Sequence, residues 1–359
     1  MTRRVWFLFL FLGFNLAQAK DFRVPVDPQA PVRSKYQHRE LGGIAVSDDF
    51  IVALTSRGWM VKVSPEGKVL WRMQTGCRPV TGPALDDTNL YYACAEGILI
   101  SRNLQDGKEN WRFKYQDSSA SIPGFSPDLL IFQSGSGMIF FLNKAEGSLK
   151  SISKQTGRTS LSMLGASPPL VNGASVYLGL LDGWVAELKL EDGSLVWEKQ
   201  IFNRPIVSDI DNELAADRDT IYAASIQGVC ALSKKSGKVF WCVNKDLAGD
   251  IAQDQDFIYA ITRDQELLII DKIAGIVEKK IPLKKSILEK WYPEKLLWIS
   301  KDEDRMIWIT NSGVWELKPN PEKPNQIMNF ANPIRAGQIY GNRLYLINSK
   351  GYLISKDMK

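Results

Sequence analysis

Residues 175–197 read SVYLGLLDGWVAELKLEDGSLVW, and this stretch decides the fold. Apolar and polar residues alternate along much of it, which is typical of half-buried β-strands. The Asp-Gly steps at 182–183 and 192–193 suit tight hairpin turns, because glycine adopts positive φ without steric cost. Residues 220–241 (TIYAASIQGVCALSKKSGKVFW) and residues 89–111 (NLYYACAEGILISRNLQDGKENW) repeat the same unit.

The unit recurs along the chain at intervals of about 38–46 residues. Its first glycine is found at Gly58, Gly97, Gly137, Gly183, Gly228, Gly313 and Gly351. The step from Gly228 to Gly313 is about twice the others, and Asp264-Gln265-Glu266 stands where the missing Asp-Gly would fall. Repeats of this length are the signature of propellers and related arrays. The sequence therefore predicts an all-β fold, an eight-bladed β-propeller of four-stranded antiparallel blades.

A tryptophan follows the second glycine of the unit by four residues in four copies, at Trp71, Trp111, Trp197 and Trp241. We expect these side chains in the outer strand, packed between adjacent blades, because each can bury a large apolar surface there. Ser151 and Lys279 occupy the equivalent positions of blades three and six. The joints after those two blades are expected to be less regular.

The ring needs a strand from the other end of the chain. The sequence ends soon after the hairpin of blade eight, which leaves that blade one strand short. We expect the closing strand at Ser34–Arg39, since closure removes exposed sheet edges. The expected organisation is a proline-containing linker at 20–33 and a single propeller domain at 34–359.

The first nineteen residues have the pattern of a secretory signal peptide. Arg3 and Arg4 precede the apolar stretch VWFLFLFLGFNL, and Ala17-Gln-Ala19 forms a cleavage site before Lys20. No later stretch has the ~20 apolar residues of a membrane span. We therefore expect cleavage after residue 19 and a soluble monomer of the periplasm, which associates with the outer membrane only through its partner. The 45 basic and 40 acidic residues are nearly balanced, which gives no indication of nucleic-acid binding.

The unit resembles the PQQ-like propeller repeat over essentially the whole mature chain. Eight blades in an exported chain resemble the outer-membrane assembly factor BamB family more than the quinoprotein dehydrogenases that share the repeat. The resemblance is most specific at Ser208-Asp-Ile-Asp211 and at Leu161-Ser-Met-Leu-Gly-Ala-Ser-Pro168. It implies a non-catalytic periplasmic scaffold that binds the POTRA domains of a BamA-like receptor and assists outer-membrane barrel assembly.

Carried over by position, the resemblance implies a binding face formed by two loops between blades. Asp209 and Asp211 would be acidic contacts, and Leu161 and Met163 would be apolar contacts. Leu164 stands where the family has an arginine, with Arg158 nearby. The alternative for the two aspartates is ordinary loop chemistry, since aspartate favours turns.

Two other functions stay open: a quinoprotein-like or sugar-active enzyme, and a propeller that binds envelope glycan. A quinoprotein needs its quinone, a calcium ion and a carboxylate base, and resembles this chain only in the repeat. Such enzymes also carry adjacent half-cystines, and no two cysteines are adjacent here. His38 is the single histidine, which disfavours a Ser-His-Asp triad or a multi-histidine zinc site. We expect no catalytic residue, cofactor or metal.

The four cysteines predict two disulfides in an oxidising compartment. Cys230 and Cys242 flank the turn at 234–237 almost symmetrically, so they are expected to face each other across two strands. Cys77 and Cys94 bracket the turn at 86–88 in a looser register. The alternative is four free thiols buried as small apolar side chains.

Overall fold

A computed structural model describes most of the chain, and the statements below concern these residues. The described ranges are 21–28, 43–154, 166–203, 209–283, 296–301, 306–310, 313–317, 324–330, 332 and 334–358.

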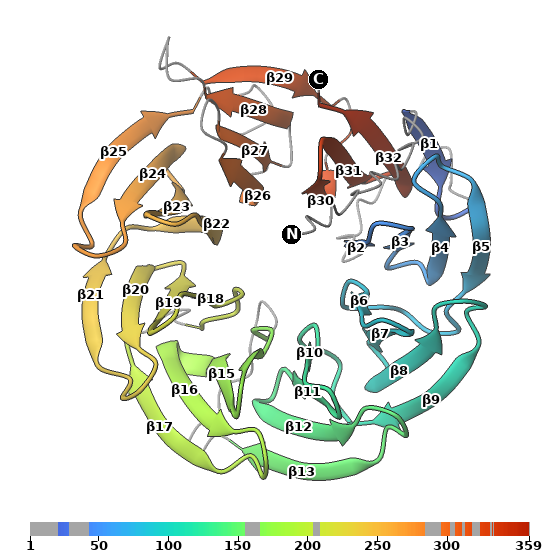
Figure 1. Ribbon diagram of the computed structural model, residues 1–359, viewed down its shortest axis with the longest axis horizontal. Helices are drawn as coiled ribbons and strands as arrows, with labels where there is room; N and C mark the ends of the chain where they lie inside the picture. Colours follow the sequence, from blue (N-terminus) through green and yellow to red (C-terminus); the bar gives the residue numbers. More distant parts are fainter. Residues whose placement is uncertain are drawn as a thin grey trace, which may run out of the picture.

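Eight four-stranded antiparallel sheets stand side by side in a closed ring, which confirms the predicted propeller (Figure 1). In each of the first seven blades the strands follow chain order from the centre of the ring to its rim. Blades one to four are β2 (Gly43–Val46), β3 (Ile51–Leu54), β4 (Trp59–Val63) and β5 (Val69–Gln74); β6 (Ala84–Leu85), β7 (Asn89–Cys94), β8 (Ile98–Asn103) and β9 (Glu109–Lys114); β10 (Gly124–Phe125), β11 (Leu129–Gln133), β12 (Met138–Asn143) and β13 (Leu149–Lys154); β14 (Leu170–Asn172), β15 (Ser175–Gly179), β16 (Trp184–Lys189) and β17 (Leu195–Gln200). Blades five to seven are β18 (Ala215–Ala216), β19 (Thr220–Ser225), β20 (Gly228–Ser233) and β21 (Val239–Val243); β22 (Leu247–Gln253), β23 (Phe257–Thr262), β24 (Glu266–Asp271) and β25 (Val277–Pro282); β26 (Leu296–Lys301), β27 (Met306–Thr310), β28 (Gly313–Leu317) and β29 (Asn325–Asn329). A 3₁₀ turn, η1 (Leu181–Gly183), lies between β15 and β16.

Blade eight joins the two ends of the chain. It consists of β30 (Ile334–Tyr340), β31 (Arg343–Asn348), β32 (Tyr352–Asp357) and, outermost, β1 (Phe22–Pro25). The prediction of an N-terminal closing strand is confirmed, but its placement at Ser34–Arg39 was wrong. The strand that pairs with β32 comes from the expected linker, with Val24 opposite Leu353. Residues 34–39 lie outside the described residues.

The position of a strand in its blade determines how deeply it is buried. In β19 every residue after Thr220 is buried, because this second strand is covered on both faces by neighbouring blades. The outermost strand β9 alternates half-buried and exposed residues, since only one of its faces meets the next blade. The apolar core is accordingly divided among eight clusters of the described residues, one at each joint between blades.

The joints between blades are called seams here, and four of them follow one design at the outermost strand. The indole Nε1–H of Trp71, Trp111, Trp197 and Trp241 donates to a backbone carbonyl of the next blade, at 2.9–3.1 Å. A turn glycine of that next blade lies against the ring: a Cβ at Gly147 would come within 2.4 Å of Trp111. Because Gly147 also has φ of +70°, both space and backbone conformation favour glycine there. The predicted structural role of the tryptophans is confirmed.

Both predicted disulfides are present. Cys230 in β20 and Cys242 in β21 are register partners with a Cα–Cα distance of 4.1 Å. Cys94, at the end of β7, is bonded to Cys77 in the segment that leads from blade one to blade two. None of the cysteines is free, so the alternative of four buried thiols was wrong.

Candidate partner-binding face

The segment between β17 and β18 holds two of the residues singled out from the sequence, Asp209 and Asp211. Both are half-buried. The three others, Leu161, Met163 and Leu164, lie in 155–165, outside the described residues.

Asp209 supports a neighbouring turn. Its Oδ1 accepts a hydrogen bond of 3.0 Å from the backbone N–H of Asp182 in η1. Asp182 has φ of +56°, a left-handed conformation that is unfavourable for a residue with a Cβ. The side chain of Gln200 donates to the carbonyl of the same residue at 3.0 Å. The Asp209 carboxylate therefore helps to hold η1 in this conformation.

The residue between the two aspartates pins the segment to blade four. Ile210 is 1% exposed, and its N–H donates to the carbonyl of Leu180 at 3.1 Å. A Cβ at Gly179 would lie 2.4 Å from Ile210 Cγ2, so the close approach depends on glycine. At the other end of the segment, the N–H of Ile201 donates to the carbonyl of Gly183 at 2.8 Å.

These contacts make η1 and residues 209–211 one platform, defined here by Asp182, Asp209 and Asp211. Its two segments are about 27 residues apart in the chain, and hydrogen bonds hold them together. Acidic side chains on a fixed backbone can recognise a basic protein surface with little ordering cost on binding. Sequence reasoning missed Asp182, since its Asp-Gly step reads as an ordinary turn.

A small hollow of about 320 Å³ begins next to this platform. It is lined by Ile201, Phe202, Asn203, Gln227 and Asn244. Three amide side chains from three different segments thus surround one depression, and amides offer both donors and acceptors to a partner. No sequence motif marks these residues.

A larger hollow of about 800 Å³ lies along the innermost strands of blades four, five and six. Its charged lining comprises Glu213, Asp217, Arg218 and Lys234. Asp217 already accepts hydrogen bonds from Tyr222 Oη and Lys272 Nζ, both at 2.8 Å. Burial raises the pKa of the Glu213 carboxyl.

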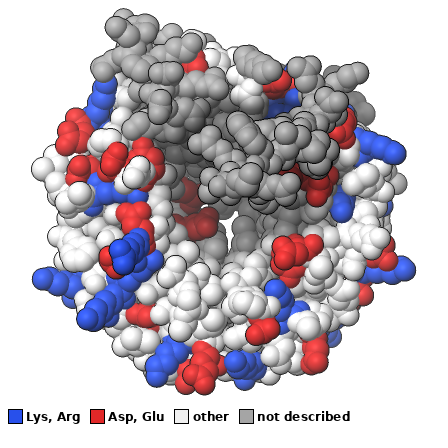
Figure 2. All heavy atoms as spheres, viewed as in Figure 1, with Lys and Arg blue, Asp and Glu red and all other residues white. Residues whose placement is uncertain are grey.

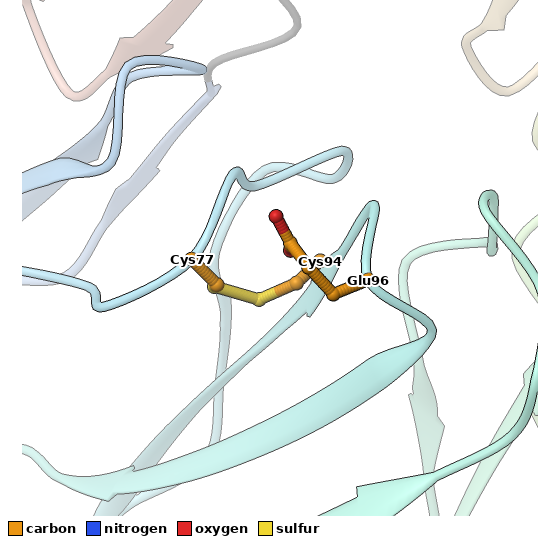
Figure 3. A group of neighbouring side chains, drawn as sticks. All are labelled: Cys77, Cys94 and Glu96. Carbon is orange, nitrogen blue, oxygen red and sulfur yellow. A yellow bond between two sulfur atoms is a disulfide. The ribbon is translucent and has the colours of Figure 1, made fainter.

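Among the described residues, one group of three side chains has the composition and proximity of a metal site: Cys77, Cys94 and Glu96 (Figure 3). Their ligand atoms lie within 4.8 Å of one another. Here the two sulfur atoms are joined in the disulfide.

The visible face of the ring carries basic and acidic side chains interspersed around the rim, with a hollow at its centre (Figure 2). Among the described residues, no helix has the length and apolar character needed to cross a bilayer.

Known proteins match this chain both in sequence and in fold. The family model described as outer membrane protein assembly factor BamB matches residues 42–281. The BamB of Yersinia pestis is 23% identical over 203 residues, 54% of this chain and 51% of that protein, so the chain spans about half of its length. The BamB of Moranella endobia is 22% identical over 324 residues, a match that covers 80% of this chain and 80% of that protein.

Solved structures agree on the fold. The crystal structure of BamB from Moraxella catarrhalis matches with a TM-score of 0.76 at 19% identity, over 88% of this chain and 95% of that one. The computationally designed protein Ika8 gives a TM-score of 0.71 at 12% identity, over 89% of this chain and 97% of that one. The fold alone therefore does not decide function, whereas the family model covers two thirds of the sequence. The chain belongs to the family of the outer membrane protein assembly factor BamB.

Proposed function

We propose that this protein is a non-catalytic scaffold of the periplasm that binds the POTRA domains of a BamA-like receptor and assists outer-membrane protein assembly. Family membership over residues 42–281 carries the proposal. The fold supports it as well, because a rigid ring presents loops from consecutive blades side by side on one face.

The contact surface in this proposal combines the acidic platform with the loop before blade four. Asp211 and Asp209 supply negative charge, and Leu161 and Met163 supply apolar anchors, with Leu164 in the place of the family's arginine. An acidic rim beside apolar anchors is a usual layout of protein interfaces. A basic strand edge on a POTRA domain would pair with the carboxylates and pack on the apolar pair.

The test is a binding measurement between the mature chain and purified POTRA domains from the same organism. Asp211→Arg should raise the dissociation constant about tenfold or more, through repulsion and lost steering. Glu191→Arg is the matched control: it makes the same charge change in the exposed β16–β17 turn, at the opposite end of β16 from η1. Leu161→Asp or Met163→Asp should weaken binding at least as much, because each places an unpaired charge in a dry contact.

Unchanged affinity in Asp211→Arg and in both apolar variants would show that this face is wrong. A wild-type chain that binds no POTRA domain would refute the partner itself.

Asp209 needs a different design, because its carboxylate holds η1. Asp209→Asn keeps an acceptor oxygen and removes the charge, whereas Asp209→Ala removes both. If Asp209 acts chiefly by positioning η1, the asparagine variant should bind close to wild type and the alanine variant should not. Equal losses in the two variants would instead indicate a direct charge contact.

Five further measurements test the alternative functions, the cleavage site, the location and the oligomeric state. The purified chain with added PQQ and calcium should oxidise no alcohol or sugar, and it should not bind envelope glycan. N-terminal sequencing of the exported chain should begin at Lys20. Cell fractionation should place the protein in the periplasm, and sizing should give a monomer. Turnover that depends on the added quinone would refute the scaffold.

A further inference from the structure

The Cys77–Cys94 disulfide differs from the other disulfide in having a carboxylate beside it. Figure 3 shows the Glu96 side chain next to the two joined sulfur atoms. Both oxygens of this carboxylate accept from the backbone N–H of Arg78, at 3.2 and 3.3 Å, so its direction is fixed. Cys94 is buried, Cys77 is half-buried and Glu96 is exposed, which leaves the group open to solvent on one side.

The segments that carry the two cysteines are held together without the sulfur–sulfur bond. The N–H of Val80 donates to the carbonyl of Ala93, and the N–H of Ala95 donates to the carbonyl of Arg78, both at 2.8 Å. These two hydrogen bonds lie on either side of Pro79 and Cys94, which pair as an isolated antiparallel β-bridge. Thr75 Oγ1 also donates to the carbonyl of Cys77 at 2.8 Å. Reduction would therefore leave both thiols and the carboxylate close to their present positions.

We propose that, in the reduced chain, Cys77, Cys94 and Glu96 form a binding site for a divalent zinc-like cation, which the disulfide closes. A dithiol reductant supplies two electrons and two protons, the sulfur–sulfur bond breaks, and the reductant leaves as its own disulfide. The cation then binds two thiolates and one carboxylate oxygen, and two protons are released. The fourth position faces solvent and takes water.

The ligand set selects the metal. Zinc accepts thiolate sulfur at about 2.3 Å and carboxylate oxygen at about 2.0–2.2 Å in tetrahedral geometry, which places such ligand atoms about 3.5–3.8 Å apart. The three ligand atoms already lie within 4.8 Å of one another, so separation of the sulfurs by side-chain rotation is enough. Calcium and magnesium prefer all-oxygen sites. An exported chain carries thiols before its disulfides form, so the site would exist in the newly exported protein.

The second disulfide provides the internal control. Among the described residues, no third cysteine, histidine or carboxylate joins Cys230 and Cys242 in such a group. The double variant Cys230→Ser/Cys242→Ser is thus a host in which reduction exposes one cysteine pair only.

The experiment measures zinc binding to this host by competition with a chromogenic chelator, after reduction with a dithiol and its anaerobic removal. The reduced host should bind one zinc ion per chain, and the oxidised host none. Glu96→Gln in the host should weaken binding about tenfold or more. Glu191→Gln, which removes an exposed carboxylate elsewhere, should leave it unchanged. Cobalt in place of zinc should give the visible and thiolate charge-transfer bands of a tetrahedral site.

Melting temperature gives a second readout that does not require the reduced host to be fully folded. Zinc should raise the melting temperature of the reduced host, and Glu96→Gln should reduce that rise. The proposal is overturned if the reduced host takes up no zinc, if its melting temperature does not respond, or if Glu96→Gln behaves like the host in both measurements.

Discussion

The seam between blades five and six holds a network of polar side chains, whereas the seam between blades three and four has aliphatic and serine side chains at the equivalent positions. Trp241 donates to the carbonyl of Lys272 at 2.9 Å, and the ammonium of that lysine reaches back to Asp217 at 2.8 Å. Tyr222 Oη donates to the other oxygen of Asp217, also at 2.8 Å. Four side chains thus join two blades through one connected network.

The same four residue types recur between blades two and three. Trp111 donates to the carbonyl of Lys144, whose ammonium lies 3.4 Å from Asp86. Tyr91 donates to that aspartate at 2.8 Å. Between blades three and four the corresponding positions hold Ser151, Leu190, Ser126 and Ile131.

Between blades three and four all four members are replaced, and the energetics favour this joint replacement. The Lys272 side chain is 4% exposed, so a lysine there without its aspartate would be a buried, unpaired charge. An aspartate or tyrosine without the lysine would likewise lose a hydrogen-bond partner in a low dielectric. Between blades three and four the whole network is replaced, and the apolar cluster around Ile131 and Phe141 packs there instead.

The largest effect is expected from Trp241→Ala. It removes the ring that packs between blades five and six together with its hydrogen bond to Lys272. The free energy of unfolding should fall by about 3 kcal/mol or more, as for other large-to-small changes at packed sites. Denaturant unfolding monitored by circular dichroism measures this value.

The control for that substitution is Phe240→Ala in the same strand. Phe240 is 55% exposed, so its loss should cost less than about 1 kcal/mol. Equal costs for Trp241→Ala and Phe240→Ala would show that the tryptophan does not hold the seam.

The second largest effect is expected at Gly237, which lies against Trp197 between blades four and five. Its φ is +63°, and a Cβ would come within 2.4 Å of Trp197 Cε3. Gly237→Ala should therefore add left-handed strain of about 1–2 kcal/mol and overpacking of about 1–3 kcal/mol. In a Trp197→Ala background the overpacking should disappear and the strain should remain. A double-mutant cycle measures this difference, and strictly additive costs would contradict the contact.

Much of this architecture could be predicted from the sequence, because the repeat is local. The period, the Asp-Gly turns and the spacing of each tryptophan predict the blades and their seams. The Cys230–Cys242 disulfide was predictable for the same reason, since one hairpin turn separates its partners. The lysines of the seams also carried a usable signal: Lys144, Lys234 and Lys272 each stand three residues before a turn glycine.

Contacts between distant segments could not be predicted in this way. β1 reads FRVP, with no turn signal or repeat motif, and its register depends on β32 at the other end of the chain. Phe22 in β1 meets Gly67 of blade one, as the tryptophans meet their glycines elsewhere. The contact of Asp209 with Asp182 was equally hidden, because nothing in either motif specifies that the two turns approach.

Low pH should weaken the seam between blades two and three, which contains Asp86, and should not affect the seam between blades three and four. Burial raises the pKa of Asp86, but hydrogen bonds from Thr88, Tyr91 and Asn89 outweigh it, and the pKa is lowered below its ordinary value of 3.8. A folded-state pKa below the unfolded value means stability that is present above the unfolded pKa and is lost as pH falls through the folded one. Asp86→Asn should therefore flatten the fall of the unfolding midpoint between about pH 5 and pH 2. Ser126→Ala, at the equivalent aliphatic seam, should leave that slope unchanged.

The smallest effect should come from Ser151, where the aliphatic seam has a serine in place of the tryptophan. Its Oγ is buried and finds no hydrogen-bond partner among the described residues. An unpaired buried hydroxyl costs free energy, so Ser151→Ala should raise the free energy of unfolding by about 0.5–1 kcal/mol.

Ser153, two residues along the same strand, is the matched control because its Oγ donates to the carbonyl of Gly193 in blade four. Ser153→Ala should lower the free energy of unfolding by about 1 kcal/mol, since it leaves that carbonyl without its donor. The two substitutions delete the same oxygen from the same strand, so only the hydrogen bond distinguishes them. Effects of the same sign would mean that packing alone holds the seam between blades three and four. The tryptophan seams would then differ from it in the shape of the packed side chains and not in hydrogen bonding.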